Sequence, residues 1–300
     1  MSDDAFHPDL RRLARVLPRT SIGPRALGPT RALSSVVSRL RVNTVPVEPA
    51  GSVSVRVFGA TSGGDLRPGL LWIHGGGYVL GTASIDDAIC GYFAEALGIV
   101  VASVDYRLAP EHPFPVPLHD CYDGLAWLAA QPNVDPERIA VGGASAGGGL
   151  AAALVLLAHE RGEIPLAFQL LTYPMLDDRT ATRTDLDERN LRMWTNKSNR
   201  FGWESYTGLP VGSPEVTGLA APARYADLSG LPSTWNGVGT CDLFYEEDLA
   251  YAARLREAGV ACEVEEVPGA FHGFDSVLPK AGVTRAFRAS QAAALASALY

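Results

Sequence analysis

The sequence has little positive charge: its 25 Lys and Arg residues stand against 33 Asp and Glu, and the net charge is −8. A nucleic-acid-binding protein needs a basic face to neutralise phosphates, so this balance argues against such a partner. It suits an anionic membrane surface equally poorly. No stretch approaches the roughly 18 apolar residues that span a bilayer, and the first residues contain no apolar core of a signal peptide. We therefore expect a cytoplasmic protein with neither nucleic-acid nor membrane partners.

Cysteine is scarce as well. The chain has four, without a CxxC pair or an accompanying histidine cluster: Cys90, Cys121, Cys241 and Cys262. A zinc site needs closely spaced ligands, so we expect no metal and no other cofactor. Reduced, mostly buried thiols are the expected state, with one disulfide pair as the alternative. The 47% hydrophobic and 19% charged residues are ordinary for a globular fold.

From about residue 52 onward, short apolar runs alternate with segments of helical periodicity. Strands are predicted at 52–57, 70–73, 99–102, 138–141, 168–171, 234–238 and 262–267. Helices are predicted at about 84–97, 118–130, 146–160, 246–258 and 280–298. Most of these strands are continuously apolar, as in sheets covered on both faces. The alternation predicts the α/β class, with a mostly parallel central sheet flanked by helices.

Two segments depart from this alternation. Residues 1–45 are Arg-rich helical stretches interrupted by Pro18, Pro24 and Pro29, whereas residues 46–300 form the α/β domain. Within that domain, residues from about 177 to 225 are polar. They also gather large side chains at Met193, Trp194, Phe201, Trp203 and Tyr206. This stretch is either a surface insertion with its aromatic residues packed inward or a cap over a binding pocket, and both descriptions can hold together.

The strongest motif is Gly143-Ala144-Ser145-Ala146-Gly147, between a predicted strand and a predicted helix. Small neighbours are needed where a strand turns sharply into a helix, and the turn exposes the serine hydroxyl at the helix amino terminus. There the helix dipole favours developing negative charge. A dinucleotide-binding loop is the alternative, since Gly147-x-Gly149-x-x-Ala152 fits a relaxed form of that fingerprint. Because these glycines fall inside the helix and no acid is placed for a ribose, we interpret Ser145 as a nucleophile.

A second motif, His74-Gly75-Gly76-Gly77, follows the strand predicted at 70–73. Consecutive glycines cost conformational entropy, so they indicate a backbone that approaches another group closely. Acyl transfer at the serine would create an oxyanion that needs N–H donors about 3 Å away. Gly76, Gly77 and Ala146 are the expected donors, and His74 is expected to anchor the loop by hydrogen bonding. The alternative is a flexible turn.

A nucleophilic serine needs a base, and the base needs a carboxylate to orient it. Among six histidines, His272 follows the last predicted strand in a loop bracketed by glycines, whereas His159 lies too far along the helix from Ser145. Asp242 follows the strand predicted at 234–238 and is the expected orienting acid. Two further aspartates are held in reserve, and three acids after Asp242 are interpreted as solvated or capping groups. These are Asp177 and Asp178, then Glu246, Glu247 and Asp248.

The order Ser145, Asp242, His272 is that of the α/β-hydrolase fold. Together with His74–Gly77, Tyr106–Pro115 and Gly143–Gly148, it makes the chain resemble the hormone-sensitive-lipase family of esterases over about residues 74–274. The resemblance implies Ser145 as nucleophile, His272 as base and Asp242 as orienter, with oxyanion donors at Gly76, Gly77 and Ala146. It also implies a small helical cap from the N-terminal region and the insertion, short to medium acyl chains, and a homodimer.

The sequence departs from the family pattern at two positions. Ala144 stands where the family usually has Asp or Thr, and Leu243 replaces the usual Pro after the acid. Neither change removes a reacting group. The prolines of Tyr106–Pro115 stiffen a structural loop, in which we expect Arg107 and Glu111 to pair and brace the glycine loop.

These observations predict a serine carboxylesterase whose partner is a small-molecule ester. Candidate pocket walls are Tyr78, Trp194, Phe201, Trp203 and Tyr206. An amidase, lactonase or peptidase with the same triad is the first alternative, because pocket and leaving group decide among them. A non-catalytic ligand-binding protein on the same scaffold is the second, and the presence of all three triad residues argues against it.

Overall fold

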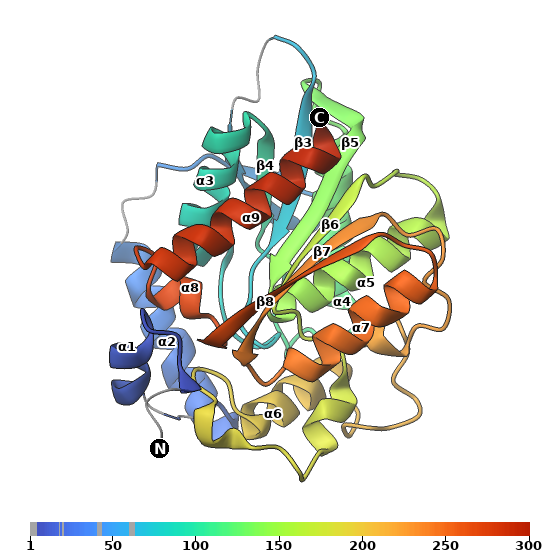
Figure 1. Ribbon diagram of the computed structural model, residues 1–300. Coiled ribbons are helices and arrows are strands. Elements are labelled where there is room, and N and C mark those ends of the chain that lie inside the picture. Colours follow the sequence, from blue (N-terminus) through green and yellow to red (C-terminus); the bar gives the residue numbers. More distant parts are fainter. Residues whose placement is uncertain (1–4, 18, 20, 41–43, 60–63) are drawn as a thin grey trace.

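The computed structural model describes residues 5–17, 19, 21–40, 44–59 and 64–300, with the backbone alone for 34–40. A single sheet of eight strands, in the order β1-β2-β4-β3-β5-β6-β7-β8, forms its centre (Figure 1). The strands are β1 (Val47–Ala50), β2 (Val53–Phe58), β3 (Arg67–Ile73), β4 (Val100–Val104), β5 (Val134–Ala144), β6 (Phe168–Thr172), β7 (Ser233–Cys241) and β8 (Cys262–Phe271). Strand β2 is antiparallel to β1 and β4, and the other neighbours are parallel. The predicted α/β class with a mostly parallel sheet is confirmed.

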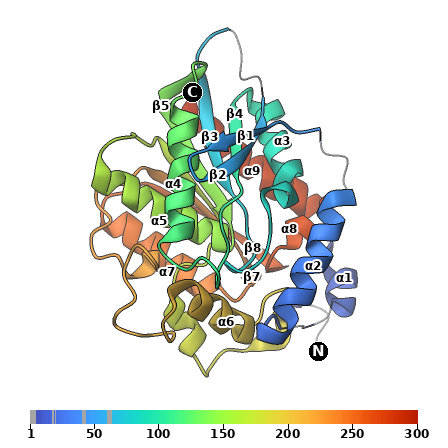
Figure 2. The same ribbon diagram turned by 180° about the vertical axis from the view of Figure 1, so that it is seen from behind.

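Helices cover both faces of the sheet (Figures 1 and 2). One face carries α3 (Asp87–Leu97) and α9 (Gly282–Leu299), and the other carries α4 (Val116–Ala129), α5 (Ala146–Arg161) and α7 (Tyr245–Glu257). The strand period of two divides successive residues between two cores. In β3, Leu70 and Trp72 join the core under α3 and α9, while Leu71 and Ile73 join the other. A sheet buried on both faces explains the continuously apolar strands.

One strand was not predicted from the sequence. Strand β1 is four residues long, contains a proline and leaves three of its residues exposed, so it carries no apolar pattern. It adds to the edge of the sheet by pairing with β2. Proline is tolerated there because an edge strand has backbone groups that face solvent.

The N-terminal helices and the insertion lie together beyond the carboxyl ends of the strands. Helix α2 (Pro24–Leu40) lies next to α6 (Asn196–Thr207) in both views, with α1 (Arg11–Val16) on the outer side of α2 (Figures 1 and 2). The short turns η3 (Asp178–Thr182), η4 (Glu188–Asn190) and η5 (Pro222–Arg224) complete the insertion.

Polar contacts join these two distant segments. The hydroxyls of Ser21 and Thr195 are 3.0 Å apart, and the N–H of Ile22 donates to Ser198 Oγ at 2.8 Å. The buried guanidinium of Arg192 donates to the carbonyl of Ala14 at 2.6 Å. These contacts hold the first helices to the insertion, which is far from them in the sequence.

The predicted helix breaks at the N-terminal prolines are only partly correct. Pro24 begins α2, where its missing N–H would have no partner inside the helix. Pro29 lies within α2 and does not end it, at the cost of one backbone hydrogen bond. Pro18 lies outside the described residues.

Candidate active site

Ser145 occupies a sharp turn between β5, which ends at Ala144, and α5. Its backbone is strained, with φ 58° and ψ −124°, a conformation that costs on the order of 1–3 kcal/mol for a residue with a side chain. Three backbone hydrogen bonds hold it there. Its N–H donates to Thr172 at 2.9 Å, and its carbonyl accepts from Gly149 and Met175, both at 3.0 Å.

Steric constraints require glycine at the positions on either side of the Ser145 turn. A Cβ at Gly147 would lie 2.1 Å from the carbonyl oxygen of Ile73, and one at Gly143 would lie 2.4 Å from the carbonyl oxygen of Gly147. Real Cβ atoms do not approach other atoms so closely. The small residues predicted around the serine thus let the start of α5 pack directly against β3.

A hydrogen-bonded network joins three residues from the carboxyl ends of β5, β7 and β8. The Oγ of Ser145 is 2.9 Å from His272 Nε2, and His272 Nδ1 is 2.8 Å from Asp242 Oδ2. The second oxygen of Asp242 accepts the N–H of Phe244 at 3.0 Å. Strands β5 to β8 are parallel neighbours, so residues that follow them meet at one edge of the sheet.

The network is nearly sealed from water. Ser145, Asp242 and His272 are 7%, 6% and 8% exposed. The rings of Tyr173 and Phe244 meet the imidazole edge-on, with centroids 4.9 and 5.2 Å away. Low dielectric strengthens the hydrogen bonds, and the flanking rings fix the plane of the imidazole. The arrangement suits transfer of the serine proton to His272 Nε2.

The glycine loop lies against the serine turn. A Cβ at Gly75 would lie 2.9 Å from the carbonyl oxygen of Ala144, and the next two glycines have positive φ angles of 128° and 59°. Within the described part of the chain, the N–H groups of Gly76, Gly77 and Ala146 donate to no protein acceptor. Unpartnered N–H groups next to a nucleophile are available to an oxyanion.

His74 supports this loop from below, as predicted. The side chain is fully buried, its Nδ1 lies 2.8 Å from the Gly75 carbonyl, and its ring stacks on Tyr106 with centroids 4.3 Å apart. Burial lowers the pKa of His74 below its usual range. A neutral histidine in this position orients the loop and does not serve as a base.

A pocket of about 480 Å³ opens beside Ser145 and His272. Apolar side chains supply most of its wall, and the described residues that line it include Leu17, Ile22, Leu80, Ile85, Asp86, Tyr173, Met193, Trp194 and Ser276. Its volume falls in the range of small-molecule sites. Leu17 and Ile22 come from the N-terminal segment, and no local signal in the sequence marks them as wall residues.

Of the five aromatic residues expected to line the pocket, the structure brings Trp194 there. Tyr78, Trp203 and Tyr206 are buried behind it, with Tyr78 stacked on Tyr206 at 4.0 Å and its hydroxyl bonded to the Met175 carbonyl at 3.0 Å. Phe201 is half-buried and packs against the same core. These four rings shape the wall indirectly, by holding the inner side of the insertion.

The reserve acids are engaged elsewhere. Both carboxylate oxygens of buried Asp178 accept from Arg224, at 2.7 and 2.8 Å, and Asp177 pairs with Arg179 at 2.7 Å. Neither carboxylate lies on His272, whose Nδ1 faces Asp242.

The interpretation of the acids after Asp242 as solvated or capping groups is wrong for two of the three. Glu246 is exposed, but Glu247 and Asp248 are buried. One oxygen of Glu247 accepts the N–H groups of Leu176 and Asp177, at 2.8 and 3.2 Å, and the other accepts the Thr180 hydroxyl. Burial raises the pKa of Glu247 to about 8. The insertion folds over the first turn of α7 and removes these acids from water.

The expected pairing of Arg107 with Glu111 is also wrong. Arg107 binds buried Asp120 at 2.6 Å, and Glu111 binds Arg31 of α2 at 2.7 Å. The two residues are four apart, but the segment between them is not helical, so their side chains point in different directions. It is Arg31 that supports the glycine loop, by donating to the Val79 carbonyl at 2.8 Å.

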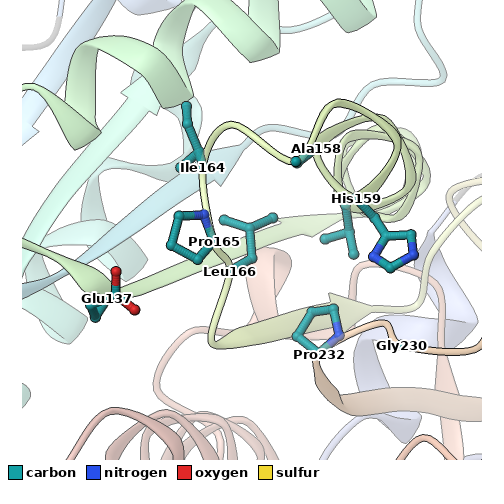
Figure 3. Close-up of a pocket in the computed structure, with 10 residues that line it drawn as sticks. Glu137, Ala158, His159, Ile164, Pro165, Leu166, Gly230 and Pro232 are labelled. Atoms are coloured by element: carbon teal, nitrogen blue, oxygen red, sulfur yellow. The ribbon is translucent and has the colours of Figure 1, made fainter.

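A second pocket, of about 520 Å³, lies at the far end of α5 (Figure 3). His159 stands at its rim opposite Pro232, and Glu137 lies on its other side. Helix α5 rises about 1.5 Å per residue, which puts His159 roughly 20 Å from Ser145. His159 is thus out of reach of Ser145, as its position in the sequence predicted, and the pocket beside it is separate from the serine site.

No helix in the described chain combines the length and apolar character needed to cross a membrane. Over the same residues, no group of three or more His, Cys, Asp or Glu is arranged to hold a metal ion. All four cysteines are free thiols, three of them buried and Cys241 partly exposed, in agreement with the predicted reduced state.

Comparison with known proteins adds independent information. A family model described as alpha/beta hydrolase fold matches residues 70–276. The carboxylesterase NlhH of Mycobacterium tuberculosis is 33% identical over 250 residues, covering 79% of this chain and 75% of the relative. Esterase LipI of the same organism is 32% identical over 283 residues, covering 91% and 82%.

Solved structures agree over the full length of the chain. A bacterial heroin esterase superposes with a TM-score of 0.88 and 36% identity, covering 100% of both chains. Esterase LipW of Mycobacterium marinum superposes with a TM-score of 0.86 and 33% identity, covering 100% of this chain and 98% of the other.

Proposed function

Because this chain is a carboxylic ester hydrolase of the hormone-sensitive-lipase family, we propose that it cleaves short- to medium-chain esters through an acyl-enzyme on Ser145. The observation that carries the proposal is the unbroken hydrogen-bonded network from Ser145 Oγ through His272 to Asp242. The serine is also the hydroxyl at the floor of an apolar pocket, where an acyl group would be held.

In the first half of the reaction, Ser145 Oγ attacks the ester carbonyl carbon while its proton passes to His272 Nε2. The carbonyl electron pair moves onto oxygen and then returns, and the leaving alkoxide takes the proton from His272. Asp242 holds Nδ1–H and stabilises the imidazolium that forms between these steps. Water repeats the sequence on the acyl-enzyme, releasing the carboxylic acid and regenerating the serine.

The negative oxygen of each tetrahedral intermediate is assigned to the N–H groups of Gly76, Gly77 and Ala146. Ala146 is the first residue of α5, so its N–H has no intrahelical partner and adds the positive end of the helix dipole. Removing one such donor typically costs about 10²–10³ in rate. Because these donors are backbone groups held by close packing, they need no reorganisation during the reaction.

The cap is assigned to residues 1–45 and about 177–225, as far as these are described. Leu17 and Ile22 from the first segment, with Met193 and Trp194 from the second, close the pocket over Ser145. A volume of about 480 Å³ must hold both the acyl and the alcohol part of the ester. That limit supports short and medium chains over long ones.

The test is hydrolysis of p-nitrophenyl esters from acetate to palmitate, with and without a phosphonate inhibitor, followed by mass spectrometry of the adduct. We expect turnover that is greatest at short or medium chains and a single adduct on Ser145. Ser145→Ala is expected to lose activity and adduct together, whereas Ser229→Ala, an exposed serine in the same chain, keeps both. Substantial turnover by Ser145→Ala would refute the mechanism.

A matched pair of an ester and its amide separates the remaining alternatives. Faster cleavage of the amide would replace the esterase assignment by an amidase one. An adduct on Ser145 without turnover of either substrate would indicate that the enzyme acts on another acyl group. Absence of both adduct and turnover would indicate a non-catalytic binding protein.

A further inference from the structure

One ionisable group in the pocket has no part in the mechanism above. Asp86 lines the pocket together with Ser145, and no lysine or arginine does so among the described residues. The remaining wall is chiefly apolar, from residues such as Leu80, Ile85 and Trp194. A carboxylate in such a wall is costly unless something compensates its charge.

The carboxylate of Asp86 neither caps a helix nor has donors on both of its oxygens among the described residues. It ends the turn η2 (Ala83–Asp86) and precedes α3, yet its side chain makes no capping bond. One oxygen accepts the indole N–H of Trp72 at 2.8 Å, and the other accepts from no donor in the described chain. The two oxygens of the neighbouring Asp87, in contrast, accept from Nε and one terminal nitrogen of Arg56, at 2.7 and 2.6 Å.

Two fully buried aspartates of this protein, Asp120 and Asp178, have carboxylates that are completely engaged in ion pairs and hydrogen bonds. Asp120 accepts from the guanidinium and the backbone N–H of Arg107, and Asp178 accepts from Arg224 and the N–H of Gly212. Both of their oxygens are engaged and both face a cation. Asp86 keeps one oxygen without a donor and forms no ion pair within the described chain, next to the space that a substrate fills.

The surrounding charges leave that anion under-stabilised. Burial raises the pKa of Asp86 to about 6, against the opposing effect of the Trp72 hydrogen bond, and Asp275 and Asp87 raise it further. Arg288 is the cation that acts in the opposite direction, but it forms no ion pair with Asp86. Above pH 6 the pocket therefore contains a negative charge that a cation would stabilise.

We propose that Asp86 makes this pocket selective for esters that carry a quaternary or protonated amine over uncharged esters of the same shape. The inference rests on the proposed function, because it assumes that the ester occupies the pocket beside Ser145. The cation would sit against the free oxygen of Asp86, with the apolar wall around its methyl groups. Esters that carry a carboxylate would be disfavoured by the same charge.

The test compares kcat/KM for two isosteric pairs that differ only in charge. Acetylcholine against 3,3-dimethylbutyl acetate places the cation on the alcohol part. The p-nitrophenyl ester of 4-(trimethylammonio)butyrate against that of 5,5-dimethylhexanoate places it on the acyl part. We expect the cationic member to be favoured about tenfold in at least one pair, the effect of one ion pair in a partly hydrated pocket.

Variants assign the preference to Asp86. Asp86→Asn keeps an oxygen for the Trp72 N–H but removes the charge, and the preference is expected to fall to about one. Asp86→Glu is expected to retain it. Glu95→Gln is the matched control, because it removes a carboxylate charge from an exposed site on α3, the helix that begins directly after Asp86, and it should keep the wild-type ratio.

The ratio is measured within each variant, so a general loss of activity does not mimic the result. An unchanged ratio in Asp86→Asn for both pairs would overturn the inference while leaving the esterase intact. No wild-type turnover of any neutral ester would instead refute the proposed function. In that case the charge preference is still read from thermal stabilisation by choline against 3,3-dimethylbutanol, and equal stabilisation would overturn it.

Discussion

Glu247 offers a quantitative test of how the insertion is attached to the α/β domain. Its carboxyl group is 7% exposed and touches the start of the insertion through Leu176, Asp177 and Thr180. Burial raises its pKa from 4.5 to about 8. In the folded protein the group thus keeps its proton over a pH range in which the unfolded chain has lost it.

The sign and size of the pH dependence of stability follow from this difference in pKa between the folded and unfolded states. Unfolding releases a proton between pH 4.5 and 8, so raising the pH through this range lowers the stability of the wild-type protein. The shift of about 3.5 units corresponds to about 5 kcal/mol in total, of which about 4 kcal/mol falls between pH 5 and pH 9. Glu247→Gln, which keeps an oxygen for both N–H groups, removes this dependence.

The measurement is the free energy of unfolding in denaturant, followed by circular dichroism at pH 5, 7 and 9. The difference in free energy of unfolding between Glu247→Gln and wild type should shift by about 4 kcal/mol in favour of the variant as the pH rises from 5 to 9. Glu246→Gln makes the same substitution at an exposed neighbour, and its stability difference from wild type should shift by less than about 1 kcal/mol over this pH range. A stability difference between Glu247→Gln and wild type that does not change with pH would refute the reasoning. It would mean that the three hydrogen-bond donors stabilise the carboxylate as much as burial destabilises it.

Three further predictions concern catalysis. Gly77→Ala should lower kcat by about 10² or more, because its Cβ would lie 2.1 Å from the ring of Trp194 and displace the N–H that we propose as an oxyanion donor. Gly98→Ala has similar backbone strain in open space and should leave steady-state kinetics unchanged; equal losses in both would assign the effect to strain alone. Asp242→Asn should lower kcat by about 10³–10⁴, since an amide stabilises no imidazolium, and a loss below tenfold would exclude Asp242 as the residue that orients His272. The cation preference assigned to Asp86 should decline as the pH falls through about 6, where the carboxylate gains its proton; a constant ratio from pH 5 to 8 would contradict that assignment.

The elements of the sheet and the reacting groups were predictable because local patterns decide them. A strand, small residues and a helix in succession predict a sharp turn at Ser145, and parallel strands bring Asp242 and His272 to the same edge. The glycine loop likewise follows from a close backbone contact. In each case the backbone conformation determines the position, and the sequence nearby determines the backbone.

The pocket wall was much less predictable, because side-chain direction depends on contacts between distant segments. The clustered aromatic residues were visible, but not that Trp203 and Tyr206 turn inward while Trp194 reaches the pocket. For the same reason Leu17 and Ile22 carried no signal. The burial of Glu247 depends on a loop that begins seventy residues earlier in the chain.

The attachment of the first helices has a consequence for how this protein can change its substrate. Leu17 and Ile22 form part of the pocket wall, yet they reach it through a few hydrogen bonds to the insertion, such as those of Ser21 and Ile22. Neither residue belongs to the strands that carry the triad. Exchange of this short segment between relatives could therefore redraw the pocket while the reacting groups stay where the sheet holds them, which makes it a natural unit for recombination and for directed evolution.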